Sequence, residues 1–382
     1  MDSVKIIRTT TVPGSLNNFC RGLLRELGEE GYEVVGVSSP GPALQELESR
    51  EGVKTIAVPM ERHISPFKDL RSLIRLIRVF RRERPTMVHS MTPKAGLLSM
   101  TAAWFARVPV RVHTFTGLVF PTATGLTKKI LILTDRITCA CATHVVPEGE
   151  GVKNDLTNYR ITRKPLKVLG YGNVRGIDLD LFDPQLPEVQ AEAAKIRRLG
   201  VLTFVFVGRL VRDKGINELV NAFARLKKEC PDIRLLLVGP QEQSLDPLDS
   251  STLELIAKDS SIEAVGSQAD VRSWLAASDV FVLPSYREGF PNVVIEAGAM
   301  GLPSIVTDIN GSREIIIEGR NGTIVPAHDE ASLYEAMKRL MDEDTRNLMK
   351  SNARGLISTR FEQSYVHGCL RNYYKEILAQ KQ

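Results

Sequence analysis

The chain alternates between short apolar, β-branched runs and longer amphipathic stretches, a pattern that predicts parallel α/β sheets. Helical patterns at 15–30, 66–83 and 93–106 lie between strand-like runs in the first half. A polar segment rich in turn residues follows at 171–200. The seven strand-like runs of the first half are 4–9, 32–38, 53–59, 87–91, 110–116, 143–148 and 166–170.

The same alternation restarts after the polar segment and predicts a second domain. Its strand-like runs are 202–208, 232–239, 262–266, 279–284, 303–308 and 322–326. Two helical patterns with no strand between them follow at about 329–358, and a last amphipathic pattern at 361–379 has no strand partner. We therefore expect an α/β protein of two doubly wound, Rossmann-like domains that face each other across a cleft. The predicted parts are an N-terminal domain (1–170), a linker (171–200), a C-terminal domain (201–360) and a helix in 361–382 that packs back on the N-terminal domain.

Composition agrees with two folded domains and narrows the environment. The chain has 382 residues, of which 43% are hydrophobic and 25% charged, which excludes disordered and repetitive classes. No run approaches the roughly 20 apolar residues that span a bilayer, and the first residues do not form a secretory signal. The five cysteines, which contain no C-x-x-C pair, predict free thiols in the cytoplasm. They are Cys20, Cys139, Cys141, Cys230 and Cys369.

Charge is distributed unevenly along the chain. Residues 1–180 hold 26 Lys and Arg against 17 Asp and Glu, a net charge of +9, whereas the remainder has a net charge of −4. One predicted helix, 65–85, concentrates this excess. We expect its apolar stripe to pack on the sheet and its cations to suit an anionic membrane surface. Nucleic acid is a weaker candidate, because no aromatic platform accompanies the charge. The stripe is Leu70, Leu73, Ile74, Ile77 and Phe80, and the cations are Lys68, Arg71, Arg75, Arg78, Arg81 and Arg82.

The segment 283–303 carries two glutamates, Glu288 and Glu296, on either side of a predicted helix start. Pro291 suits the first position of that helix, whose N–H groups at Asn292 and Val293 would then face a phosphate. Two carboxylates beside a diphosphate can accept hydrogen bonds from sugar hydroxyls. The alternative for either glutamate is a capping acid or a solvated helix residue.

A second segment, 207–215, directly follows a strand-like run. Gly208 ends that strand, and Arg209 and Lys214 follow it. Two cations at the carboxyl end of a strand suit a diphosphate. Surface ion pairing is the alternative for each cation taken alone.

Together these two segments resemble the family 4 glycosyltransferases, which are retaining enzymes of the GT-B fold. The matching motifs are G-R-L-x-x-x-K-G at 208–215 and E-G-F-P-x-x-x-x-E at 288–296, the latter including Gly289 and Phe290. The resemblance implies that Arg209 and Lys214 hold the donor diphosphate. It further implies that Glu288 contacts the donor sugar and Glu296 the ribose of the nucleotide.

The N-terminal half matches this family less fully. The family's glycine-rich turn after the first strand is represented by Gly14 alone, which we expect to approach the donor. Many relatives carry a histidine immediately before the glycine at 117, where this chain has Thr116. His113, three residues earlier, is a candidate catalytic residue or a core residue. The HTFTG segment at 113–117 resembles a subgroup of capsule, O-antigen and exopolysaccharide glycosyltransferases.

Two further motifs are set aside. The run LGYGNVRG at 169–176 nearly forms a dinucleotide-binding fingerprint, but Arg175 stands where its third glycine is required. Asp178 and Asp180 form a D-x-D sequence, of the type that holds a metal ion, within the predicted linker. We expect neither a metal nor another cofactor.

The predicted function is transfer of a hexose from a nucleotide sugar, expected to be UDP-linked, to a polyprenyl-linked glycan in bacterial surface polysaccharide synthesis. The expected location is the cytoplasm or the inner face of the cytoplasmic membrane. One alternative is a non-hydrolysing nucleotide-sugar 2-epimerase of the same architecture. Another is a nucleotide-binding subunit without catalytic activity.

Overall fold

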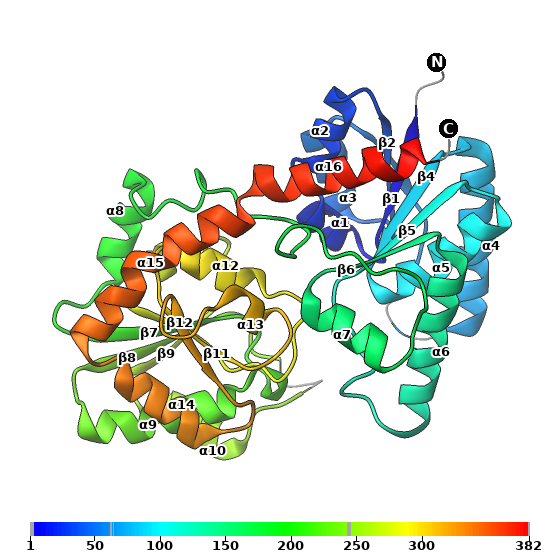
Figure 1. Ribbon diagram of the computed structural model, residues 1–382. Coiled ribbons are helices and arrows are strands. Elements are labelled where there is room, and N and C mark those ends of the chain that lie inside the picture. Colours follow the sequence, from blue (N-terminus) through cyan, green and yellow to red (C-terminus); the bar gives the residue numbers. More distant parts are fainter. Residues whose placement is uncertain (1–3, 62, 64, 243–245, 381–382) are drawn as a thin grey trace. The chain divides into compact units, whose positions relative to one another are not determined.

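The computed structural model describes residues 4–61, 63, 65–242 and 246–380, and it divides the chain into two compact units (Figure 1). Unit 1 comprises residues 1–176 and 364–382, and unit 2 comprises residues 177–363. Each unit contains one six-stranded sheet whose paired strands are all parallel. The prediction of two doubly wound α/β domains is therefore confirmed.

The sheet of unit 1 has the strand order β3-β2-β1-β4-β5-β6. Its order reverses between β1 and β4, which are hydrogen-bonded neighbours with Ile7 opposite Val88. Ligands of such sheets bind outside the carboxyl ends of the strands at this reversal. The strands are β1 (Lys5–Thr9), β2 (Glu33–Ser38), β3 (Lys54–Ala57), β4 (Met87–Met91), β5 (Val110–Phe115) and β6 (His144–Pro147).

Helices cover both faces of this sheet. One buried cluster joins the sheet to α4, α5, α6 and α7, and the other joins it to α1, α2, α3 and α16. Because Tyr374 of α16 is buried and accepts a hydrogen bond from Arg8 of β1 (2.5 Å), the last helix belongs to the core of unit 1. The helices are α1 (Pro13–Phe19), α2 (Leu23–Glu29), α3 (Pro42–Glu51), α4 (Pro66–Glu83), α5 (Pro93–Phe105), α6 (Gly125–Cys141), α7 (Glu150–Asn158) and α16 (Gln363–Ala379).

Two predicted elements of unit 1 differ in the structure. The pattern at 15–30 forms two helices rather than one, because Gly22 takes a positive φ of 78° and interrupts it. The carboxylate of Glu51 then accepts hydrogen bonds from the N–H groups of Gly22 (2.9 Å) and Arg25 (3.3 Å) at the start of α2. The predicted strand at 166–170 is reduced to a single bridge between Val145 and Leu166.

The predicted apolar stripe of α4 is also partly wrong. The helix buries Ser72, Leu76, Val79, Phe80 and Glu83, whereas two members of the predicted stripe are exposed. The Ser72 hydroxyl donates to the Pro59 carbonyl (2.5 Å), and the Glu83 carboxylate accepts from Lys54 (2.9 Å). Both polar residues therefore have hydrogen-bond partners inside the protein, and a prediction from hydrophobicity alone assigns the wrong face of α4 to the core. The exposed members are Leu70 (55%) and Ile74 (40%).

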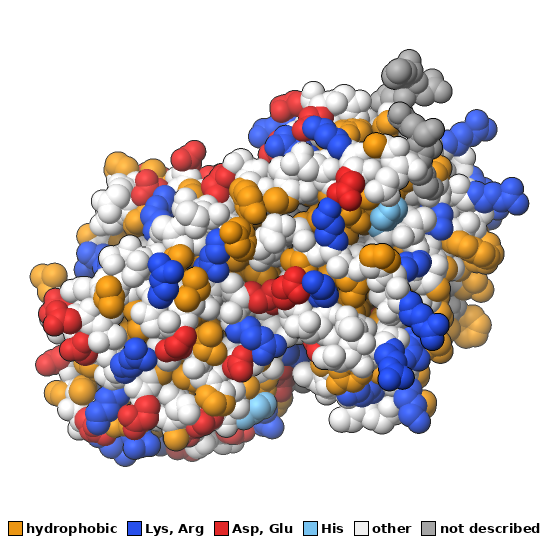
Figure 2. Space-filling view, in the orientation of Figure 1, with side chains coloured by type: hydrophobic (Ala, Val, Ile, Leu, Met, Phe, Trp, Pro, Cys, Tyr) orange, Lys and Arg blue, Asp and Glu red, His pale blue; other side chains and the backbone are white. Residues whose placement is uncertain are grey.

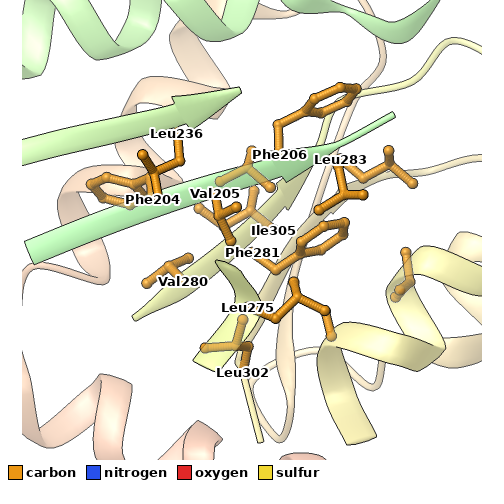
Figure 3. Close-up of a cluster of buried hydrophobic side chains, with 14 of the residues drawn as sticks. Phe204, Val205, Phe206, Leu236, Leu275, Val280, Phe281, Leu283, Leu302 and Ile305 are labelled. Atoms are coloured by element: carbon orange, nitrogen blue, oxygen red, sulfur yellow. The ribbon is translucent and has the colours of Figure 1, made fainter. Parts of the chain in front are cut away.

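The sheet of unit 2 has the strand order β12-β11-β10-β7-β8-β9 and reverses between β7 and β10. Figure 3 shows the buried side chains around these two strands, among them Phe204 and Phe206 of β7 and Phe281 of β10. The strands are β7 (Leu202–Val207), β8 (Ile233–Val238), β9 (Ile262–Gly266), β10 (Val280–Leu283), β11 (Ser304–Thr307) and β12 (Gly322–Val325).

The predicted linker is structured: residues 171–176 belong to unit 1, and from residue 177 onward it packs within unit 2. Arg354 of α15 donates hydrogen bonds to the carbonyls of Leu179 (2.9 Å), Phe182 (2.5 Å) and Ala299 (2.5 Å), which ties the segment after residue 176 to this unit. A helix, α8, also forms inside the segment. The helices are α8 (Pro187–Ile196), α9 (Ile216–Glu229), α10 (Ser250–Lys258), α11 (Arg272–Ala276), α12 (Asn292–Ala299), α13 (Ser312–Ile315), α14 (Glu330–Arg339) and α15 (Glu343–Phe361), and a 3-10 turn, η1, spans Arg212–Lys214.

Candidate active site

Three predicted site residues meet at the strand-order reversal of unit 2. Arg209 and Lys214 follow the carboxyl end of β7, and Glu288 follows the carboxyl end of the neighbouring strand β10. Parallel neighbours end at the same edge of a sheet, and this edge is where ligands of doubly wound sheets bind. The topology thus brings together residues that are about 75 positions apart in the sequence.

A glycine allows the two loops to approach closely. Gly215, at the start of α9, has a positive φ of 69°, and a Cβ atom there would lie 2.1 Å from the carbonyl oxygen of Pro284. Glycine adopts this backbone conformation readily, and it has no side chain that would push the two loops apart. Gly215 therefore permits the contact between Lys214 and the loop that begins after β10.

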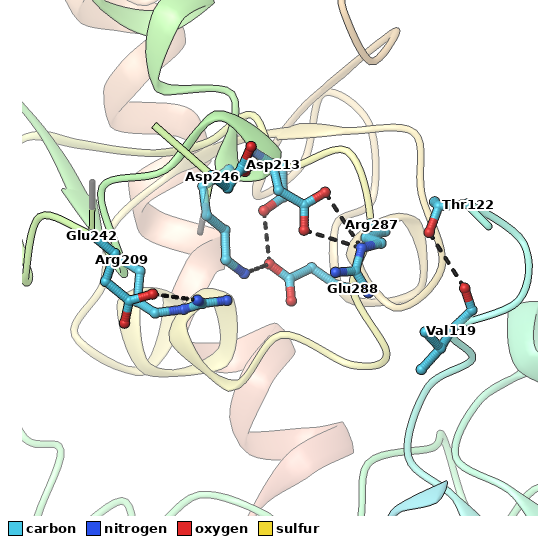
Figure 4. Close-up of polar contacts among 10 residues, drawn as sticks. Val119, Thr122, Arg209, Asp213, Glu242, Asp246, Arg287 and Glu288 are labelled. Carbon is cyan, nitrogen blue, oxygen red and sulfur yellow. Dashed lines mark hydrogen bonds and ion pairs between the residues drawn. The ribbon is translucent and has the colours of Figure 1, made fainter. Parts of the chain in front are cut away.

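Lys214 and Glu288 form an ion pair between these loops (Figure 4). Their side chains are only 18% and 17% exposed, and the Glu288 carboxylate also accepts a hydrogen bond from the Ser285 hydroxyl (2.8 Å). A partly buried pair is screened less by water than a surface pair. Ser285 is a positioning group that the sequence motifs alone did not indicate.

Arg209 is also paired, with a residue that sequence analysis missed. Its guanidinium lies 2.8 Å from the Glu242 carboxylate, and the two side chains are 49% and 34% exposed (Figure 4). A pair this exposed contributes about 0–1 kcal/mol. Both cations that are predicted to bind a diphosphate are therefore paired with carboxylates in this structure, and the pair of Arg209 is the more exposed of the two.

Further polar contacts hold η1 and the first turn of α9 in place. The Asp213 N–H donates to the Asp246 carboxylate (2.6 Å), and the Asp213 carboxylate pairs with Arg287 (3.0 Å). Tyr286 donates its hydroxyl proton to Glu218 (2.6 Å), and burial together with this acceptor raises the pKa of Tyr286. Each contact joins the loop after β10 or the segment before α10 to η1 or to α9.

The segment Gly289 to Glu296 leads into α12. Pro291 is the residue before this helix rather than its first residue, and Asn292 is the first. The residues before α13 pack closely on this segment, because a Cβ atom on Gly311 would lie 2.5 Å from the Gly289 carbonyl oxygen. Glu296, in the middle of α12, is buried at 9% exposure, which does not fit a solvated helix residue.

Two other members of this segment have structural surroundings. Phe290 is 5% exposed, and its ring lies 5.5 Å from the ring of Phe361. Val293, the second residue of α12, packs partly buried against the core of unit 2. Phe290 therefore anchors the start of α12, where a phosphate was predicted to bind.

The candidates of unit 1 have different surroundings. His113 is 1% exposed, its Nδ1 lies 2.8 Å from the Ser90 hydroxyl, and burial lowers its pKa to about 3. Its ring also fills the space where Gly96 has no side chain. This geometry favours core packing over proton transfer. Gly14 lies in the first turn of α1, exposed, with open space where a side chain would be.

The D-x-D sequence has a local structural explanation. The Asp178 carboxylate accepts hydrogen bonds from the N–H groups of Asp180 (3.1 Å) and Leu181 (2.9 Å), which closes a turn. Within the described residues, no group of three or more His, Cys, Asp or Glu side chains could hold a metal ion.

Unit 1 contains a cavity that sequence analysis did not predict. It has a volume of about 460 Å³ and lies at the carboxyl ends of β1, β4 and β5, with α6 along one wall. Asp135 of α6 lines it at 9% exposure, and burial raises the pKa of this carboxyl to about 7. In the sequence Asp135 is one polar residue among several in an amphipathic helix, so no signal distinguishes it.

A doubly wound sheet that presents paired cations and carboxylates at its strand-order reversal has the architecture of a ligand-binding site. Comparison with known proteins identifies the family. Residues 202–343 match the family described as "Glycosyl transferases group 1", and residues 14–172 match the "Glycosyl transferase 4-like domain". The chain belongs to this glycosyltransferase family, and the protein is a glycosyltransferase.

Two relatives are similar over most or all of the chain. The capsular polysaccharide biosynthesis glycosyltransferase CapM of Staphylococcus aureus is 31% identical over 386 residues, which cover 100% of both chains. The UDP-Gal:alpha-D-GlcNAc-diphosphoundecaprenol alpha-1,3-galactosyltransferase of Escherichia coli is 31% identical over 317 residues, or 81% of both chains.

Solved structures show the same fold. A glycosyltransferase from Rickettsia africae ESF-5 superimposes with a TM-score of 0.80 at 23% identity, covering 99% of both chains. Alr3699/HepE of Anabaena, solved in complex with UDP, has a TM-score of 0.80 at 16% identity and covers 98% of this chain and 100% of its own. The fold is therefore GT-B. Across the described residues, every helix is too short or too polar to span a membrane.

Proposed function

We propose that this protein is a retaining glycosyltransferase that transfers a sugar from a UDP-sugar to a polyprenyl-linked glycan during synthesis of a bacterial surface polysaccharide. The observation that carries the proposal is the meeting of Arg209, Lys214 and Glu288 at the strand-order reversal of unit 2. The names of the two relatives support the capsular pathway and the diphosphoundecaprenol-linked acceptor.

In the proposed reaction, the acceptor hydroxyl attacks the anomeric carbon on the face from which the diphosphate leaves. The bond from carbon to phosphate oxygen breaks as the new glycosidic bond forms, and the leaving phosphate oxygen accepts the hydroxyl proton. Arg209 and Lys214 exchange their carboxylate partners for the diphosphate and stabilise its growing charge. Glu288 then accepts hydrogen bonds from the donor sugar, and Glu296 from the ribose.

Titration with UDP and with uridine tests the diphosphate assignment. Arg209→Ala and Lys214→Ala should each weaken UDP binding and leave uridine binding unchanged, and each should lower turnover about 10²–10³-fold. Arg212→Ala is the matched control, because Arg212 lies in the same turn but pairs with Asp249 at the surface (2.9 Å). Equal UDP affinity in all three variants and the wild type would refute the assignment.

The two glutamates are distinguished by a matched pair of substitutions. Glu288→Gln should lower turnover and reduce discrimination between donor sugars, because Glu288 contacts the sugar. Glu296→Gln should mainly weaken binding of UDP itself. Each loses a charge-assisted hydrogen bond worth about 1.5–3 kcal/mol. If UDP bound Glu288→Gln poorly and Glu296→Gln normally, the two roles would be exchanged.

Two controls address the metal and the epimerase alternative. Turnover should persist in EDTA, since cationic side chains replace the metal, and a reversible loss on chelation would contradict this. Incubation with the UDP-sugar alone should leave the sugar unchanged apart from slow hydrolysis. Conversion to its 2-epimer would instead favour the epimerase.

We also propose that unit 1 binds an anionic membrane surface through α4. On the face drawn in Figure 2, basic and hydrophobic side chains lie together over the part of unit 1 where Figure 1 labels α4, α5 and α6. Arg75 and Arg78 are exposed, and Phe67, Leu70 and Ile74 lie beside them along one side of the helix. Each cation near such a surface contributes about 1 kcal/mol.

Vesicle sedimentation tests this membrane proposal. The protein should bind vesicles that contain phosphatidylglycerol and not pure phosphatidylcholine, and high salt should release it. Replacing Arg75 and Arg78 by Gln should weaken binding. The matched control replaces Lys195 and Lys258, exposed lysines of unit 2, and should have no effect. Equal losses in both variants would show a general charge effect only.

A further inference from the structure

The cavity of unit 1 lies where a doubly wound sheet binds its ligand. It is bounded by the residues that follow β1, β4 and β5, and the strand order of this sheet reverses between β1 and β4. Its volume of about 460 Å³ falls within the roughly 300–1,000 Å³ range of ligand sites. His113 and Gly14, the candidates of unit 1, are not among the residues that line it.

The wall of the cavity is largely apolar, and most of its polar groups are already engaged. The hydroxyls of Thr11 and Thr92 lie 2.9 Å apart, and the Thr134 hydroxyl donates to the Leu131 carbonyl (2.8 Å). The Lys94 ammonium pairs with the Asp69 carboxylate (2.5 Å). A sugar that entered the cavity would lose its hydrogen bonds to water and would need these groups as new partners. A hydrocarbon chain has no such hydrogen bonds to replace. The apolar lining is Val12, Leu97, Leu118, Val119, Ile130 and Leu131.

The cavity is continuous with an exposed apolar stripe on α6. Ile130 belongs to both, because it lines the cavity and is 38% exposed. The same side of α6 exposes Leu126 (73%), Leu133 (57%) and Ile137 (39%), at the i, i+4, i+7 and i+11 positions that share one helix face. Lys129 and Arg136, which are seven residues apart and share one side of this stripe, are exposed as well. A continuous apolar path with a basic flank fits a lipid chain that leaves an anionic membrane.

We propose that this cavity binds the isoprenoid chain of the lipid-linked acceptor, at the end that carries the diphosphate and glycan. The proposal rests on the proposed function for the identity of the lipid. The cavity itself is assigned from its position, its lining and its continuity with the α6 stripe. Ile130 and Leu131 are the residues that contact the chain.

Asp135 makes this binding depend on pH. Its carboxyl lines the cavity, and among the described residues no side chain donates a hydrogen bond to it. A hydrocarbon beside an ionised carboxylate leaves that charge without solvation, so the bound state favours the neutral acid. The other charged groups on the cavity wall are Asp69 of α4 and Lys94 of α5, which pair with each other. Cys139, one turn further along α6, has its pKa raised by burial to about 12 and stays neutral.

Displacement of a neutral apolar dye tests the assignment on the full-length protein. N-phenyl-1-naphthylamine should bind with increased fluorescence, and farnesol should displace it while N-acetylglucosamine should not. Ile130→Asp should weaken dye binding at least tenfold, whereas Leu133→Asp, the same change outside the cavity, should not. Displacement by the sugar, or equal effects of the two substitutions, would overturn the proposal.

Two further variants keep the test decisive. Leu97→Trp fills the cavity without adding charge and should also abolish dye binding, with UDP affinity as the check that the protein is folded. Dye affinity should fall by up to tenfold per pH unit above about pH 7 in the wild type and stay constant in Asp135→Asn. Retained dye binding in Leu97→Trp would contradict the site. Loss of glycosyl transfer to every lipid-linked acceptor would instead refute the proposed function, whatever the dye shows.

Discussion

Asp135→Asn should stabilise unit 1 at neutral and alkaline pH. Asp135 is only 9% exposed, and burial raises the pKa of its carboxyl from 3.8 to about 7. As the pH rises between these values, the unfolded chain loses the proton while the folded chain keeps it. Folding stability therefore falls across this window and is constant above it.

The size of the effect follows from the shift. The pKa of Asp135 rises by about three units, and each unit corresponds to about 1.36 kcal/mol. Above neutral pH, ionisation of Asp135 therefore lowers the free energy of unfolding of the wild type by about 4 kcal/mol relative to its value at acidic pH. Asparagine has nearly the shape of the neutral acid and does not titrate. The variant should thus equal the wild type near pH 4 and exceed it by about 4 kcal/mol near pH 8.

Urea unfolding read by pulsed hydrogen exchange measures this for each unit separately. Peptides from β4 and β5 report on unit 1, and peptides from β7 and β8 provide an internal control in unit 2. Only the first set should shift its midpoint between wild type and variant, and only as the pH rises above about 4. A stability difference that is the same near pH 5 and near pH 8 would refute the reasoning, because it could not come from ionisation of Asp135.

Three other substitutions test separate parts of the structure. Gly215→Ala should abolish UDP binding, because the new side chain clashes with the facing loop. Gly319→Ala is the control: Gly319 has a similar positive φ but open space around it, so this substitution should lower stability only through backbone strain. UDP titration and thermal unfolding measure both effects. Tyr374→Phe should cost about 1–3 kcal/mol in urea unfolding of unit 1, because it removes one acceptor of the buried Arg8 guanidinium and leaves only its contacts with His89 and Met91. Glu242→Gln should raise UDP affinity up to about fivefold, as expected for removing an exposed competing ion pair, and unchanged affinity would show that the pair does not compete.

The alternation of apolar runs was sufficient to predict both sheets, because their central strands, such as β4, β8 and β10, are buried on both faces and are strongly apolar. Prediction failed where a local or tertiary contact overrides the pattern. The strand at 166–170 has only one bridging partner at the sheet edge, and the helix at 15–30 is interrupted where Gly22 meets the Glu51 carboxylate. Neither contact partner is near in sequence.

The candidate donor site was predictable from motifs because its residues follow two strands that the topology places side by side. The ion pairs and hydrogen bonds that hold these residues could not be predicted from the motifs. Glu242 and Ser285 carry no motif signal, and each takes its role from a contact between loops that the folded sheet brings together. The same limit applies to α4, where the buried polar residues Ser72 and Glu83 shift the buried face away from the most apolar side.

The exposed face of α4 carries apolar side chains as well as cations. If the predicted stripe of α4 had packed on the sheet, its cations alone would have faced a membrane. Instead Leu70 and Ile74 are exposed beside Arg71 and Arg75, so the same surface offers both charge and hydrocarbon contact. A helix that places apolar residues between cations binds anionic bilayers more strongly than either feature alone. Since α4 packs on α5, and α5 on α6, the proposed membrane surface of α4 and the cavity wall formed by α6 belong to one layer of helices on the same face of the sheet.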